Sequence, residues 1–162
     1  MNGIAAIQTA LESTGRIPRW FLSDFSDADM LVRPVPGANH AAWQLGNVIG
    51  GDIALVRSQL PDAAFPELSD ALQHRFGAEG TGLDHGFPTR DELLDLFDRV
   101  RAATIANLET LSDADLDRPT TGNVAQIAPT LGALFLLVSN HTLLHAGQFS
   151  VIRRKLDKPV LV

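Results

Sequence analysis

Four stretches of the chain place apolar residues three and four positions apart, as on one side of an amphipathic helix. The pattern predicts helices over about 3–25, 39–60, 89–111 and 131–155. No stretch alternates apolar and polar residues with a period of two, so no sheet is predicted. The pattern therefore indicates an all-α protein built around four long helices.

Breakers and capping residues divide these helices. Gly15 and Pro18 should kink or break the first one, because proline lacks the backbone donor of a helix interior. Thr89 with Glu92 three positions later has the pattern of a capping box, which marks the start of the third helix. The side of the third helix opposite its apolar stripe is charged and includes Arg101.

A long connection, rich in proline and glycine, separates the second and third helices. It covers residues 61–88 and has room for one short helix over 69–76. So long a connection fits a compact domain if these two helices run parallel, because the chain must then return along the bundle. We therefore predict one domain over 1–162, a four-helix bundle with up-down-down-up topology and a long crossover between helices 2 and 3.

The last predicted helix carries two histidines one turn apart. His141 and His145 share one helix face, and Gln148 continues it three positions later. Two imidazoles at this spacing can chelate one metal ion. The same pair is also compatible with two hydrogen-bonded core residues, since no acid lies between them as in a His-Glu-x-x-His motif. Both interpretations stay open from the residues alone.

The second predicted helix has an unusual face formed by Trp43, Asn47, Gly50 and Gly51. Each glycine in a helix interior costs about 1 kcal/mol relative to alanine. A helix that keeps two adjacent glycines is expected to be approached closely there, by another backbone or by a ligand. Asn47 lies one turn before them and should face the same gap.

Composition narrows the classes of function. The 162 residues are 45% hydrophobic and 20% charged, as in an ordinary globular protein, and the net charge of −6 argues against a nucleic-acid partner. The chain has no cysteine, which excludes disulfides and a thiolate of its own. Its longest unbroken apolar run, Ala133 to Val138, is too short to span a membrane, and its first residues are unlike a secretory signal. A cytoplasmic location is therefore expected.

Two segments resemble the DinB/YfiT-like superfamily. Residues 141–156 combine a His-x-x-x-His with Gly-Gln and an arginine-rich helix end, and residues 36–47 contain Trp-x-Leu-Gly before Asn47. The resemblance implies a four-helix bundle that is often a homodimer. It also implies a divalent metal, zinc or nickel, held by three histidines. Two of these match His141 and His145, but the third family position falls on Asn47.

That asparagine leaves three outcomes open. The amide oxygen of Asn47 is a weaker ligand than imidazole toward zinc or nickel, but it could still bind, with water completing the shell. A different residue could replace it, from the candidates His85, Asp52 and Gln148. The third outcome is a site without metal. His40 is expected in an exposed turn at a helix start, too far along the helix to replace Asn47.

The resemblance implies a metal-dependent enzyme acting on a small molecule. Family members include transferases that use low-molecular-weight thiols, whose pKa the metal lowers, and a hydrolase with metal-bound water fits the same residues. The substrate pocket is expected between the second and fourth helices, walled by Trp43, Gly50, Gly51 and Gln148. No catalytic residue is assigned. The alternative is a non-catalytic small-molecule-binding or dimerising bundle, whose metal site is degenerate because of Asn47.

Overall fold

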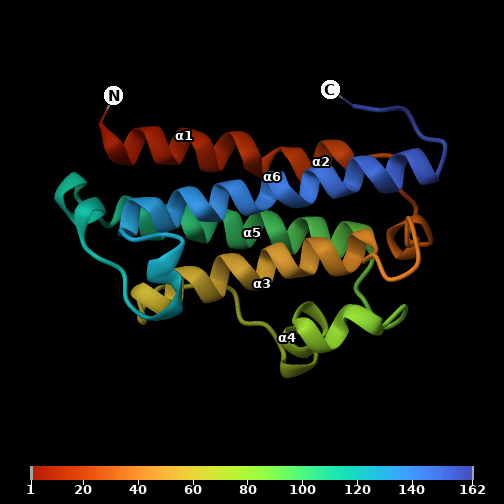
Figure 1. Ribbon diagram of the computed structural model, residues 1–162, viewed down its shortest axis with the longest axis horizontal. Coiled ribbons are helices and arrows are strands. Elements are labelled where there is room, and N and C mark those ends of the chain that lie inside the picture. The colour runs from red at the N-terminus through yellow and green to blue at the C-terminus, as the bar shows by residue number, and fades with distance from the viewer. Residues whose placement is uncertain (1, 162) are drawn as a thin grey trace.

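The computed structural model describes residues 2–161 and is a bundle of helices (Figure 1). Its long helices are α1 (Gly3–Gly15), α3 (Ala41–Gln59), α5 (Arg90–Glu109) and α6 (Leu131–Lys155). In Figure 1, α1 and α6 run from left to right, whereas α3 and α5 run from right to left. The all-α helical bundle predicted from the sequence is confirmed.

The first predicted helix is divided in two. It ends at Gly15, and the short helix α2 (Ile17–Phe21) begins after one intervening residue, with Pro18 in its first turn. Proline is tolerated there because the first backbone N–H groups of a helix have no partner within it. The predicted break at Gly15 and Pro18 is confirmed.

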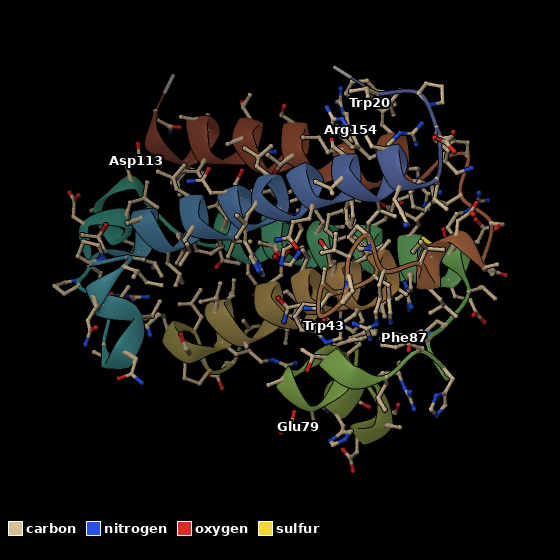
Figure 2. The ribbon with its side chains drawn as sticks, turned by 45° about the vertical axis from the view of Figure 1, so that its right-hand side comes forward. Trp20, Trp43, Glu79, Phe87, Asp113 and Arg154 are labelled. Atoms are coloured by element: carbon tan, nitrogen blue, oxygen red, sulfur yellow. The ribbon has the colours of Figure 1, made fainter. Side chains whose placement is uncertain are left out.

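The long connection between α3 and α5 folds onto the outer side of α3 (Figure 1). It contains α4 (Asp70–Phe76) and the 3-10 turn η2 (Ala78–Gly82). The ring of Phe76 lies over Gly46 so closely that a Cβ at position 46 would be 2.2 Å from it. The indole N–H of Trp43 also donates to the carbonyl of Gly77 at 3.0 Å, and Figure 2 shows this side chain between α3 and the connection. Position 46 must therefore remain glycine for α4 to pack here.

The other connections are short turns. They are η1 (Asp29–Leu31), η3 (Asp113–Asp117) and η4 (Gly122–Gln126). The predicted capping box of Thr89 and Glu92 forms at the start of α5. Within residues 2–161 there is no strand, only an isolated bridge between Pro119 and Thr130, and no helix there is both long and apolar enough to cross a membrane.

Candidate metal and small-molecule site

His141 and His145 converge from one face of α6. Their Nε2 atoms lie 3.1 Å apart, and the ring planes are inclined at 75°. His145 is buried and His141 is partly buried. Bonds from imidazole nitrogen to zinc are about 2.0–2.1 Å long, so two nitrogens at this separation can reach the same ion. The donor atoms and their spacing are therefore compatible with two ligands of one metal.

Burial keeps both imidazoles uncharged. Desolvation lowers the pKa of His145 to about 4, and the neighbouring His141 lowers it further in the same direction. Desolvation, and then the positive charge of Arg101, lowers the pKa of His141. Neutral imidazole is the form that binds a metal, so no proton has to leave an imidazolium at neutral pH.

Two residues of α3 contact this pair. Oε1 of Gln44 lies 3.2 Å from Nδ1 of His145. A Cβ built on Gly51 would lie 2.9 Å from Cε1 of His141. The close approach expected at the glycines is therefore present at Gly51, but the approaching group is an imidazole, not a backbone or a ligand. Gly50 is different, since a Cβ built on it would meet only Cβ of Phe76, at an ordinary 3.8 Å.

Asn47 lies on α3 between the two residues that touch the histidines. It follows Gln44 by three positions and precedes Gly51 by four, so its backbone belongs to the same flank of the helix. Its amide nitrogen nevertheless donates to the carbonyl of Phe76 at 3.2 Å, on the side of α4. The third family position is therefore near the pair, while its side chain is engaged elsewhere.

The other candidate ligands do not join the histidines. Residues 2–161 contain no group of three or more His, Cys, Asp or Glu residues that could hold a metal ion. His85 is exposed on the connection, and Asp52 faces Arg101. Gln148 is exposed on α6. His85 and Asp52 are thus wrong as third protein ligands, because one lies at the surface and the other is paired with a cation.

The ion pair of Asp52 and Arg101 lies in the middle of the bundle. Both side chains are almost fully buried, and Oδ2 of Asp52 is 3.1 Å from Nη2 of Arg101, without the alignment of a hydrogen bond. Arg101 also donates to the hydroxyls of Thr142 at 2.7 Å and Thr14 at 3.4 Å. Desolvation raises the pKa of Asp52 to about 7, although Arg101 opposes the shift. The pair links α1, α3, α5 and α6 beside the histidines.

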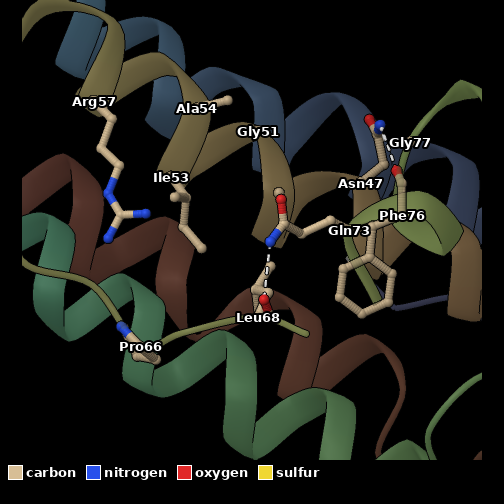
Figure 3. Close-up of a pocket in the computed structure, with 11 residues that line it drawn as sticks. Asn47, Gly51, Ile53, Ala54, Arg57, Pro66, Leu68, Gln73, Phe76 and Gly77 are labelled. Atoms are coloured by element: carbon tan, nitrogen blue, oxygen red, sulfur yellow. Dashed lines mark hydrogen bonds between the residues drawn. The ribbon is translucent and has the colours of Figure 1, made fainter. Parts of the chain in front are cut away.

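A pocket of about 470 Å³ opens between α3 and the connection that follows it (Figure 3). Asn47 and Gly51 form part of the wall on α3, and Phe76 and Gln73 belong to the opposite side. Arg57 is the charged residue of the lining. Gly51 lines the pocket and also lies against His141, so the pocket and the histidine pair adjoin at this residue.

The predicted pocket walls are only partly found here. Gly50 and Gly51 line the pocket. Trp43 does not line it directly, although its indole bonds to the carbonyl of Gly77, which does. Gln148 lies on the exposed side of α6 and is absent from the lining. The pocket is formed by the long connection and α3, not by the second and fourth long helices as expected.

Comparison with known families agrees with the all-α helical bundle. The model of the DinB superfamily matches residues 10–149. The chain belongs to the DinB superfamily. The DinB match includes Asn47, His141 and His145, and DinB proteins often bind metal. A search of curated proteins finds no match.

Two polar residues at the start of α3 are buried, which was not predicted from the sequence. His40 is fully buried, not exposed: its Nδ1 accepts from the N–H of Trp43, and its Nε2 donates to the carbonyl of Leu83. Gln44 was not among the predicted site residues. Its position three residues before Asn47 was the available signal, because that spacing places both on one helix flank.

Proposed function

We propose that this DinB protein is a metal-dependent enzyme that acts on a small molecule, with zinc or nickel bound by His141 and His145. The observation that supports the proposal is the 3.1 Å separation of the two Nε2 atoms. Two imidazoles supply only part of a coordination shell. The amide oxygen of Asn47, water and substrate are left to complete it, and open positions are typical of catalytic metal sites.

The metal would act as a Lewis acid that lowers the pKa of a bound thiol or water, and so supplies the nucleophile. Since the chain has no cysteine, a thiol would come from a low-molecular-weight cofactor. Arg57 in the pocket lining offers a positive charge to an anionic group of the substrate, and the ring of Phe76 offers apolar contact. Thiol-dependent transfer and hydrolysis are both compatible with these residues.

A second candidate function is non-catalytic binding of a small molecule in the same pocket. Two observations support it: the amide of Asn47 bonds to Phe76, and residues 2–161 contain no three-residue cluster of His, Cys, Asp or Glu. In this case the two imidazoles form a hydrogen-bonded pair without metal.

Self-association is also proposed, through the outer face of α6. Four large apolar side chains on this face are about half exposed: Leu136, Leu143, Leu144 and Val151. Leu136, the neighbours Leu143 and Leu144, and Val151 follow one another at intervals of seven or eight residues, as in the contact stripe of packed helices. Light scattering after size exclusion tests the proposal: we expect a dimer that becomes a monomer in Leu143→Glu, whereas a monomeric wild type contradicts it.

Metal content separates the two functions. The purified protein is incubated with zinc or nickel, desalted and measured by elemental analysis, beside His141→Ala/His145→Ala. The matched control is His74→Ala/His85→Ala, in which two exposed histidines are removed. We expect one metal per chain in wild type and control, and none in the first variant. Absence of metal from the wild type would favour the non-catalytic function.

A further inference from the structure

We propose that Gln44 is a positioning residue that determines which nitrogen of His145 carries the proton. Gln44 and His145 are both buried, with exposed fractions of 1% and 5%, and they join α3 to α6. The consequence for metal binding rests on the proposed function, but the protonation pattern does not.

The orientation of the Gln44 amide follows from its second partner. Its Nε2 lies 2.8 Å from the carbonyl oxygen of Asn39. A carbonyl can only accept, so this atom must be the NH₂ group; the flipped amide would place two oxygens against each other. Oε1 is therefore the atom that faces His145.

An amide oxygen can only accept as well, so Nδ1 of His145 must donate to it. In a neutral imidazole the other nitrogen is then unprotonated. Nε2 of His145 therefore carries a lone pair, and this lone pair points toward Nε2 of His141 at 3.1 Å. This is the form of the ring that can bind a metal through Nε2.

The same hydrogen-bond partners determine which nitrogen of His141 carries the proton in the metal-free protein. Its Nε2 faces a lone pair and must donate, which leaves its Nδ1 without a proton. That Nδ1 is buried and has no hydrogen-bond partner among the described residues. An unpartnered acceptor is easier to accommodate than an unpartnered N–H, so this assignment agrees with the surroundings. The two histidines are thus inequivalent: His145 is already in the metal-binding form, whereas His141 must move its proton from Nε2 to Nδ1.

Nitrogen NMR of the ¹⁵N-labelled, metal-free protein tests the assignment. Long-range correlations from the ring protons distinguish a protonated from a bare nitrogen. We expect His145 to be protonated at Nδ1 and His141 at Nε2. His40 is an internal reference, because its Nδ1 accepts from a backbone N–H and its Nε2 donates to a carbonyl, which requires the Nε2–H form. Finding His145 protonated at Nε2 would overturn the proposal.

Two variants at position 44 test whether the glutamine is the cause. Gln44→Leu removes the acceptor, so His145 should no longer be held in the Nδ1–H form and should show both the Nδ1–H and the Nε2–H form. Gln44→Met has a side chain of similar length without an acceptor, so His145 should show both neutral forms in this variant as well. Gln148 lies on the exposed side of the same helix as His145, so Gln148→Leu should leave His145 in the Nδ1–H form. An unchanged His145 spectrum in folded Gln44→Leu or Gln44→Met contradicts the proposal.

Metal titration then connects this result to function. Loss of a residue that orients a histidine ligand typically costs about ten- to a hundredfold in affinity. We expect that loss for nickel in Gln44→Leu and near wild-type affinity in Gln148→Leu. If the wild type has the expected protonation pattern but binds no nickel, the metal-dependent function fails while the role of Gln44 in orienting His145 stands. If the wild type binds nickel and Gln44→Leu binds it equally well, the proposed role of Gln44 in metal binding is wrong, while the metal-dependent function stands.

Discussion

The backbone of Gly51 in α3 lies against the imidazole of His141 in α6, and a Cβ at position 51 would be 2.9 Å from Cε1. An alanine there must push the ring away, since real Cβ contacts are longer than this. The ring is the end of a mobile side chain, so the fold should persist while the 3.1 Å contact to His145 is lost.

We therefore expect Gly51→Ala to weaken nickel binding by about tenfold or more, on the scale of a lost ligand support. Isothermal titration measures the affinity, and thermal unfolding checks the fold. Gly50→Ala is the matched control, because a Cβ there meets only Phe76 at 3.8 Å. That control should keep the affinity and gain up to about 1 kcal/mol from the better helix propensity of alanine. Equal affinities in the two variants would show that His141 does not depend on the close approach of Gly51.

The buried ion pair is expected to be important for stability. Arg101→Met leaves Asp52 without its cation in the middle of the bundle, and breaking such a pair costs about 3–5 kcal/mol. Urea unfolding should show this loss, and the double variant Asp52→Leu/Arg101→Met should recover part of it. Arg99→Met removes an exposed arginine from the same helix and should change little. A stability loss of less than 1 kcal/mol in Arg101→Met would contradict this role.

The pKa of His145 predicts how metal-free stability depends on pH. The folded pKa of about 4 lies below the ordinary value of 6.5, so the unfolded chain binds a proton that the folded chain does not between these values. The contribution of His145 is therefore complete above about pH 6.5 and is lost as the pH falls toward 4. Asp52, with its raised pKa, acts in the opposite direction over nearly the same range, so the two must be separated by mutation.

We expect the stability difference between wild type and His145→Gln to shrink as the pH is lowered from 7 to 4.5 in the presence of a chelator. Urea titrations at several pH values measure it, and His74→Gln, at an exposed histidine, is the control. A difference that stays constant over this range would mean that His145 is not buried in its neutral form.

Much of this fold could be predicted from local signals. The break near Pro18, the capping box at Thr89 and the extent of α6 depend on residues close together in the sequence, so spacing and capping rules reach them. The convergence of His141 and His145 is of the same kind, because both lie on one helix.

The predictions that were wrong concern contacts between segments far apart in the sequence. Arg101 was placed on a charged side of its helix, yet it is buried because Asp52 approaches from α3. His40 was expected in an exposed turn, yet the long connection covers it, and the carbonyl of Leu83 accepts a hydrogen bond from its ring. Such partners are dozens of residues away, and no periodicity within one segment reveals them. Spacing places Gln44 on the flank of α3 that carries Asn47, but it does not show that His145, on another helix, lies opposite it.

The residue that departs from the family pattern gives a further prediction. Asn47→His restores the third histidine position and removes the side-chain amide that donates to the carbonyl of Phe76. We expect nickel affinity to rise by about tenfold or more, the scale of a gained ligand. Asn47→Leu has a similar size and no ligand atom, and should not bind more tightly than wild type. An Asn47→His protein that binds like wild type would mean that position 47 does not reach the histidine pair.

Anomalous X-ray diffraction at the nickel edge, on crystals grown with nickel, most directly tests whether His141 and His145 bind one metal ion. We predict an anomalous peak within bonding distance of Nε2 of both residues, and no such peak in crystals of the His141→Ala/His145→Ala variant. A peak found only at surface histidines such as His74 or His85, or a hydrogen-bonded His141–His145 contact that persists at saturating nickel, would contradict it.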